Sequence, residues 1–212
     1  MCYLTYKEFV DACLELIGRS QEIGDNWKAN GNVDVEGNFF ISKKRCIPEI
    51  HETQNSTTDI MDGSNSKLIS SQNDYFEPDD PSCFYEYQQC DSITYDYHVV
   101  YSISHSVPVL YFNAWYMTGN SLKLEDIWSR IPTQFKEQVM LRKWESLTQH
   151  DHPVLGVPYF QLHPCNTMKL MSQLKFENEP SLELKGKKYI LSWLSMFGPI
   201  VGLELSNQYF TT

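Results

Sequence analysis

Two strand-like runs joined by a very short link constrain the fold of this chain more than any other feature. In the first run, Ile93 to Ser104, aromatic and branched residues alternate with other residues, and the second run, Val107 to Met117, is equally rich in β-forming residues. The link holds His105 and is far too short for a crossover connection, so the two runs should pair as an antiparallel hairpin. The core of the fold is therefore expected to be an antiparallel sheet.

Helical patterns precede and follow this hairpin. The sequence Thr5-x-x-Glu8 has the form of a capping box, and the apolar spacing after it predicts an amphipathic helix over residues 6–20. A smaller hairpin is predicted between Trp27 and Cys46, around a glycine-containing turn. Further helices are expected over residues 124–131, 134–147 and 188–197, the last ending at Gly198-Pro199 with the glycine as C-cap. This order favours an α+β fold, an antiparallel sheet flanked by helices, over an alternating parallel α/β sheet.

The composition changes sharply between the two hairpins. Residues 47–92 are rich in Ser, Thr, Asn, Gln, Asp and Glu and are interrupted by Pro78 and Pro81, which predicts a long, acidic, flexible loop. A chain of 212 residues is long enough for one domain with a substantial core. We therefore expect a single domain over residues 1–212 that carries this loop as an insertion.

Charge and cysteine usage exclude several classes of protein. The formal net charge of −10 opposes binding to phosphate backbones, so nucleic acid is not an expected partner. The six cysteines form no Cys-x-x-Cys pair and no regular framework, which is typical of reduced thiols in the cytosol. No stretch is long and apolar enough to span a bilayer, and the first residues do not resemble a secretion signal. We expect a soluble, cytoplasmic protein.

A single thiol stands at a predicted strand-to-helix corner. Irregular sequence over 149–158 leads into an extended segment, 159–162, which is followed by His163-Pro164-Cys165 and a helical pattern over 168–174. With Asn166 or Thr167 as the N-cap, unpaired backbone N–H groups and the helix dipole would favour the thiolate, the form that attacks a carbonyl or thioester. Cys165 is therefore the candidate nucleophile. It could instead be a small buried hydrophobe, and His163 could simply satisfy local hydrogen bonds.

An ordered set of motifs across the chain resembles one known family. In chain order the motifs are Tyr97-His98-Val99-Val100-Tyr101-Ser102, Val107-Pro108-Val109-Leu110-Tyr111-Phe112, Leu124-Glu125-Asp126-Ile127-Trp128, His152-Pro153-Val154-Leu155-Gly156, His163-Pro164-Cys165, and Ser192-Trp193-Leu194-Ser195 with Gly198-Pro199. Together they closely resemble the ubiquitin-conjugating-like enzymes of autophagy, the autophagy-related protein 10 family. The resemblance covers about the whole chain apart from the acidic loop, and it implies a variant of the ubiquitin-conjugating fold and a cytosolic location.

The resemblance also implies a reaction and three partners. Cys165 would accept the ubiquitin-like autophagy-related protein 12 as a thioester from the activating enzyme, autophagy-related protein 7, and transfer it to a lysine of autophagy-related protein 5. His163 would position the acceptor lysine or stabilise the oxyanion. His105 lies where many relatives carry a tyrosine that orients the lysine. The chain lacks the upstream His-Pro-Asn of ordinary ubiquitin-conjugating enzymes, so His163, Asn166 or a backbone N–H would have to serve the oxyanion. The interpretation includes no cofactor and no metal.

Three alternatives remain open at this stage. A zinc site could use ligand types that are close in sequence, namely His150, His152, His163 and Cys165, although their spacing is not a strong zinc pattern. A cysteine protease could pair Cys165 with His98 or His152 as the base. A noncatalytic adaptor could bind partners through the acidic loop and the aromatic hairpin.

Overall fold

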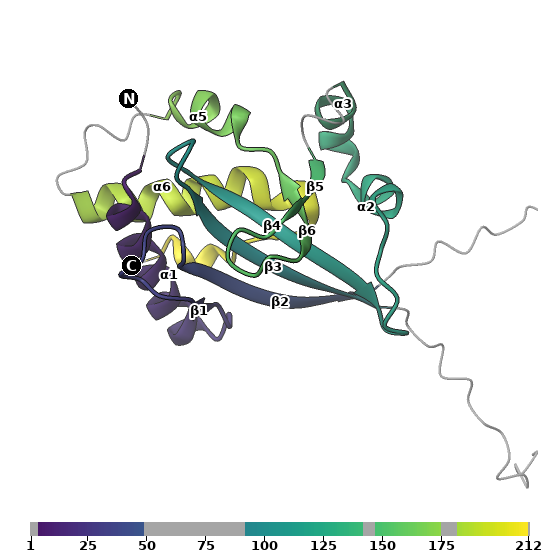
Figure 1. The fold of residues 1–212 in the computed structure, drawn as a ribbon, viewed down its shortest axis with the longest axis horizontal. Helices are drawn as coiled ribbons and strands as arrows, with labels where there is room; N and C mark the ends of the chain where they lie inside the picture. The colour runs from purple at the N-terminus through teal and green to yellow at the C-terminus, as the bar shows by residue number, and fades with distance from the viewer. Residues whose placement is uncertain (1–3, 49–91, 142–146, 175–181, 212) are drawn as a thin grey trace, which may run out of the picture.

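A six-stranded antiparallel sheet organises the part of the chain that a computed structural model describes, residues 4–48, 92–141, 147–174 and 182–211. The strands follow the order β1-β2-β3-β4-β6-β5 across the sheet, and each neighbouring pair is antiparallel (Figure 1). Their bounds are β1 Lys28–Asn30, β2 Phe40–Pro48, β3 Ser92–Ser102, β4 Val107–Tyr116, β5 Leu147–Asp151 and β6 Pro158–Leu162. With the helices described below, this architecture confirms the predicted α+β fold.

The central hairpin pairs as the sequence predicts. β3 and β4 are in register from Ile93 opposite Tyr116 to Ser102 opposite Val107, so the turn between them holds residues 103–106. The smaller hairpin is also confirmed, because β1 pairs with the start of β2. Nearly every residue of β3 is buried, which shows that both faces of the sheet are covered.

One face of the sheet carries the main core and the two longest helices. α1 (Tyr6–Ile23) lies beside α6 (Leu182–Phe197), and Figure 1 shows α6 running behind the strands. The predicted capping box is present: the Thr5 hydroxyl accepts the N–H of Glu8, and the Glu8 carboxylate accepts the N–H of Thr5. The helix continues three residues past its predicted end because Gly24, with φ 71°, supplies the left-handed residue that terminates it.

α6 begins earlier and ends for a different reason than the sequence predicted. Its first turn precedes Lys188 and includes Gly186, where an added Cβ would lie 3.2 Å from the Glu8 carbonyl oxygen on α1. At the other end the chain continues after Phe197 into a short 3₁₀ helix, Gly198–Val201. Gly198 is not a left-handed C-cap. A Cβ there would lie 2.4 Å from the Leu203 carbonyl oxygen, so close backbone approach is what requires glycine.

The segment that precedes the candidate nucleophile corrects two predictions. α2 (Leu124–Arg130) agrees with the sequence, and α3 (Thr133–Leu141) agrees with the start of the helix predicted over 134–147. Residues 142–146 lie outside the described residues, and Leu147, the predicted last residue of that helix, opens strand β5 instead. The stretch over 149–158 is likewise not wholly irregular, because β5 continues to Asp151 and pairs with β6. β5 and β6 form a hairpin joined by the short loop 152–157, and this pairing overrides local helical propensity at the start of β5.

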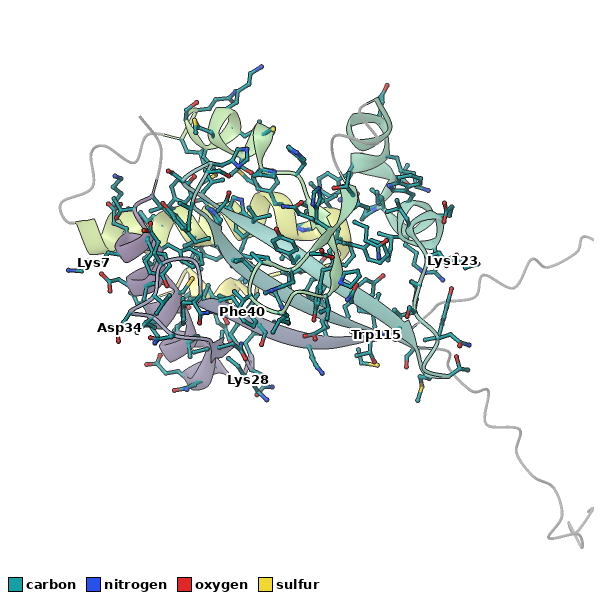
Figure 2. All side chains as sticks on the ribbon, in the orientation of Figure 1. Lys7, Lys28, Asp34, Phe40, Trp115 and Lys123 are labelled. Carbon is teal, nitrogen blue, oxygen red and sulfur yellow. The ribbon has the colours of Figure 1, made fainter. Side chains whose placement is uncertain are left out.

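The second face of the sheet is covered by a loop rather than by a helix. Residues 152–157, which connect β5 to β6, run in front of β3 and β4 in Figure 1. Phe40, labelled in Figure 2, contributes to the small apolar cluster on this face, and its ring lies 4.8 Å from that of His152 in the loop. The other buried members of this cluster are Val100, Val109, Tyr111 and Tyr159.

The sequence also predicted an acidic loop over residues 47–92 and no membrane-spanning segment. Most of the predicted acidic loop, residues 49–91, lies outside the described residues, whereas its expected margins are strand: Ile47 and Pro48 close β2, and Ser92 opens β3. None of the helices within the described ranges has the length and apolar character needed to cross a membrane.

Candidate active site

Cys165 is exposed and is the first residue of helix α5 (Cys165–Met171), directly after β6. The predicted N-cap was wrong: Pro164, not Asn166 or Thr167, holds that position, and the helix ends at Met171 rather than at residue 174. The Pro164 carbonyl oxygen accepts the N–H of Thr167 over 2.9 Å. Proline suits the start of a helix because its missing N–H would have no partner there. The thiol therefore stands at the strand-to-helix corner that the sequence predicted.

His163 contacts Cys165 through both of its ring nitrogens. The backbone N–H of Cys165 donates to Nδ1 of His163 over 3.2 Å, and Nε2 of the same ring lies 3.9 Å from the Cys165 Sγ. Because a backbone N–H can only donate, Nδ1 must accept, and the neutral ring carries its proton on Nε2. An Nε2–H group next to the sulfur can donate to a thiolate or to an oxygen bonded near it, but it cannot remove the thiol proton.

His105 joins these two residues from the turn between β3 and β4. Its ring centroid lies 6.4 Å from that of His163, with the ring planes at 80°. Figure 1 shows α5 next to the end of this hairpin. The turn is fixed by the N–H of Ser106, which donates to the Ser102 carbonyl over 2.8 Å, and by the N–H of Leu4, which donates to the Ser106 carbonyl over 3.2 Å. The three predicted site residues thus come together from two distant segments.

Two serines that sequence reasoning missed hold the His105 ring. Nδ1 of His105 lies 3.1 Å from the Ser102 Oγ and 3.0 Å from the Ser104 Oγ. Hydroxyl side chains next to histidine in a tight turn are a weak signal, although their spacing of one and three residues could have raised the question. Their contact depends on how the turn folds, which the sequence pattern alone does not specify.

Helix α5 is buried on one side and exposed on the other, and the Cys165 thiol lies on the exposed side. Met171, one of the last residues of α5, is fully buried in the main core, and Thr167 is buried as well. Cys165 and Met168 face outward on the same short helix. Burial on one side fixes the helix, and exposure on the other side leaves the sulfur accessible to another polypeptide.

The histidines of the protease alternative serve a buried network instead. His98 Nδ1 lies 3.1 Å from His152 Nε2, and His98 Nε2 lies 3.4 Å from an Asp96 carboxylate oxygen. His152 Nδ1 accepts the backbone N–H groups of Val154 and Leu155. Burial, assisted by the neighbouring His98 and opposed by Asp96, lowers the pKa of His152 to about 4. This network sits in the cluster under the β5–β6 loop and holds that loop against the sheet.

The ligands of the zinc alternative lie in two separate places. His152 is fully buried in that network, whereas His163 and Cys165 contact each other at the exposed start of α5. Among the residues that the structure describes, no three His, Cys, Asp or Glu side chains gather as a metal site would require.

The buried network of Asp96, His98 and His152 could be predicted only in part. The alternation along β3 could have placed Asp96 and His98 on one face, but nothing in the sequence indicated that His152 lies opposite them.

Known proteins are similar to this chain over most of its length. The family described as autophagocytosis associated protein, active-site domain, matches residues 8–208. The ubiquitin-like-conjugating enzyme ATG10 of Homo sapiens is 34% identical over 210 residues, which cover 98% of this chain and 92% of the human protein. The ATG10 enzyme of Arabidopsis thaliana is 39% identical over 114 residues, 52% of this chain and 50% of the plant protein.

The antiparallel sheet with its flanking helices and these matches define the class: a ubiquitin-conjugating-like transferase. More particularly, the chain belongs to the autophagocytosis associated protein family and groups with its ATG10 enzymes. It is a ubiquitin-like-conjugating enzyme of autophagy.

Proposed function

We propose that Cys165 accepts autophagy-related protein 12 as a thioester from the activating enzyme, autophagy-related protein 7, and that the chain then transfers it to a lysine of autophagy-related protein 5. The observation that carries this proposal is the placement of an exposed sulfur 3.9 Å from Nε2 of His163, with His105 beside that histidine. The match over residues 8–208 supports treating the chain as one catalytic domain. The free thiols Cys13, Cys46 and Cys165 support a reducing compartment, and we place the reaction in the cytoplasm.

The first step is an exchange between two thiols. A thioester and a thiolate give another thioester and another thiolate, so the step is nearly balanced in free energy. It requires an accessible thiolate more than a strong base, and the position of Cys165 at the exposed start of α5 meets that requirement. The Nε2–H of His163 lies 3.9 Å from the sulfur and can donate to it when it leaves as a thiolate in the second step.

The second step, attack by lysine, is harder and depends on position. The amine must be neutral and aligned with the thioester carbonyl, and alignment supplies much of the rate. As negative charge develops on the carbonyl oxygen next to the sulfur, His163 is the side chain placed to donate to it. His105 lies on the hairpin side of the site, where an incoming lysine would pass.

The acceptor binds, in this proposal, along the hairpin that carries His105. A surface groove of about 320 Å³ opens beside the turn and is lined mainly by apolar side chains. Ser102 and Ser104, which contact His105, also line this groove, so a bound segment would continue directly into the site. We assign the groove to the extended segment of the acceptor that bears the lysine. Ile103, 57% exposed, stands at its rim.

Charging and discharge of the purified protein test this proposal. With the activating enzyme, autophagy-related protein 12 and ATP, we expect an adduct that reducing agents cleave and that Cys165→Ala abolishes. On addition of autophagy-related protein 5, the adduct should decay as an amide product appears. If the activating enzyme becomes charged but the wild-type chain never does, the noncatalytic adaptor function is favoured instead.

The groove has its own matched pair of variants. Ile103→Asp should leave charging unchanged and raise the concentration of acceptor needed for half-maximal discharge by roughly tenfold, the effect of losing one well-packed contact residue. Met117→Asp is the control, because Met117 is also exposed but follows the opposite end of β4. Equal effects of the two substitutions would show that the acceptor does not bind in the groove.

A further inference from the structure

The histidines of this chain differ in what their ring nitrogens meet. Nδ1 of His163 faces one backbone N–H, and Nδ1 of His152 faces two. A backbone N–H only donates, so protonation of either nitrogen would replace a hydrogen bond by a repulsive contact. Nδ1 of His105 instead faces two hydroxyl groups. His105 is therefore under a different constraint from the other two.

The serine hydroxyls and the His105 nitrogen form a closed triangle. Its sides are 3.1 Å from Nδ1 to Ser102, 3.0 Å from Nδ1 to Ser104 and 3.2 Å between the two hydroxyls. A hydroxyl both donates and accepts. When Nδ1 carries a proton it donates to one serine, and when it does not it accepts from one, while the second serine completes the chain. His105 can thus change its tautomer or its charge without losing this bond.

Nε2, the other ring nitrogen of His105, is available to accept a proton. Within the described chain, Nε2 of His105 has no hydrogen-bond partner, and the nearest aromatic ring across the turn is that of His163. With Nδ1–H donating to a serine, Nε2 keeps a lone pair and can accept a proton. Neither His163, whose Nε2 bears the proton, nor the buried His152 is free to do so at this place.

We propose that Ser102 and Ser104 are positioning residues, which hold His105 so that its Nε2 takes a proton from the acceptor lysine. This inference rests on the proposed transfer reaction. It assigns the two serines a role in the aminolysis step and none in the charging step. Ser102 and Ser104 act through His105 and do not themselves touch the reacting atoms.

The step balances as follows in protons and bonds. The lysine ammonium gives one proton to Nε2 of His105 and becomes a neutral amine. The amine nitrogen attacks the thioester carbonyl carbon, the carbon–sulfur bond breaks, and the electron pair leaves with the Cys165 sulfur. The nitrogen then loses its second proton to that sulfur. The products are an amide, a thiol and a protonated His105, which returns its proton to water.

Other titratable groups surround the turn and enter any pH profile. His163 faces His105 from the β6–α5 side, and Cys165 lies against His163. Burial raises the pKa of the Tyr101 hydroxyl, next to the turn, and Glu36 in the loop before β2 and Glu8 on α1 add to the rise. These groups are the same in the wild type and in the serine variants. The difference between their pH profiles therefore reports the effect of the two serine hydroxyls on His105.

Single-turnover discharge with two nucleophiles tests the inference. The charged enzyme is mixed either with autophagy-related protein 5 or with hydroxylamine, which is already uncharged at neutral pH and needs no proton acceptor. For the double variant S102A/S104A we expect normal charging, normal discharge by hydroxylamine, and discharge by lysine that is roughly tenfold slower, below the about 10²–10⁴-fold cost of losing a proton-transfer group outright. The deficit should shrink as pH rises and the lysine loses its proton to solvent.

Two further variants separate positioning from structure. S102T/S104T keeps both hydroxyls and should restore lysine discharge to within about twofold of the wild type. Ser129→Ala is the control, because that hydroxyl donates to a backbone carbonyl on α2 and touches neither histidine. Equal slowing with both nucleophiles, or no slowing with either, overturns the inference. If His105→Ala slows lysine discharge and the serine variants do not, Ser102 and Ser104 are not positioning residues, although His105 still acts in the transfer. A wild type that never charges contradicts the proposed function itself.

Discussion

The backbone N–H of Cys165 donates to Nδ1 of His163 over 3.2 Å, and this one bond decides which ring nitrogen faces the sulfur. The two residues are separated only by Pro164, whose ring limits the backbone to a narrow range of φ. The turn therefore places a donor, the Nε2–H group, next to the Cys165 Sγ. That arrangement is suited to stabilising charge on sulfur and on a neighbouring oxygen, and it is unsuited to general base catalysis.

His163→Ala should charge normally and discharge slowly. Removing the donor next to the carbonyl oxygen should lower the single-turnover rate of transfer to lysine by roughly a hundredfold to a thousandfold, by analogy with the loss of one oxyanion donor. His163→Asn should retain more activity, because its side-chain oxygen can still accept the N–H of Cys165 while its amide donates. A folded His163→Ala variant that fails to charge would show that the histidine serves the first step and that its assigned role is wrong.

Close backbone approach at Gly198 gives a stability prediction. Gly198→Ala should lower the free energy of unfolding by about 1–3 kcal/mol, because the new methyl group would lie 2.4 Å from the Leu203 carbonyl oxygen and the backbone must move. Gly18→Ala is the control. Gly18 lies inside α1 with no atom within 4 Å of its added Cβ, so this variant should gain about 0.5–1 kcal/mol from helix propensity. Denaturant unfolding of both variants measures the difference, and a neutral Gly198→Ala would contradict the packing argument.

Burial of His152 predicts a pH dependence of stability. Its pKa of about 4 in the folded chain is below the ordinary value of 6.5, so the unfolded state binds more protons between these two values. The stabilisation is complete above about pH 6.5 and is lost as the pH falls toward about 4, amounting to at most roughly 3 kcal/mol. Burial is the largest cause of the lowered pKa, His98 adds to it and Asp96 opposes it, while the rings of Tyr111 and Tyr159 pack against His152.

Unfolding measured at several pH values tests this prediction. His152→Asn is the useful variant, because its side-chain oxygen can replace Nδ1 as acceptor for the N–H groups of Val154 and Leu155 without a titrating ring. The variant should show a smaller loss of stability between neutral pH and about pH 4 than the wild type. Parallel curves for the two proteins would mean that His152 does not contribute to the acid sensitivity.

The parts of the fold that could be predicted are those encoded within a few residues. The capping box at Thr5 and Glu8, the hairpin of β3 and β4, and the corner at Cys165 all depend on local sequence, and the structure agrees with each. The hairpin of β5 and β6 is also local, but it was missed because β5, Leu147–Asp151, is mostly polar and lacks the apolar alternation that indicates a strand. The contact between His98 and His152 joins segments that are far apart in the chain, and no pattern within either segment indicates it.

The candidate site divides in the same way. Proline and cysteine at the end of a strand indicated where the thiol stands, and the hairpin indicated that His105 occupies a turn. The meeting of His105 with His163 joins the β3–β4 turn to the β6–α5 corner, and only the three-dimensional arrangement shows it. The hydroxyl triangle around His105 likewise depends on side-chain orientation within the turn.

Replacing sulfur by oxygen gives a prediction for the intermediate. Cys165→Ser should form an oxygen ester with the modifier that resists reducing agents and transfers to lysine far more slowly, because an alkoxide is a poorer leaving group than a thiolate. Gel analysis with and without reducing agent distinguishes the two adducts. An oxygen ester that discharged as fast as the thioester would show that departure of the sulfur does not limit transfer.

The central claim is that one particular sulfur carries the modifier, and locating the adduct by mass spectrometry tests it most directly. Cys46 provides the internal control, because it is also a free, exposed thiol but lies on β2, away from both site histidines. After charging under non-reducing conditions, we expect the modifier's C-terminal glycine on Cys165 alone, with full charging of Cys46→Ala. An adduct on Cys46, or undiminished charging of Cys165→Ala, would contradict it.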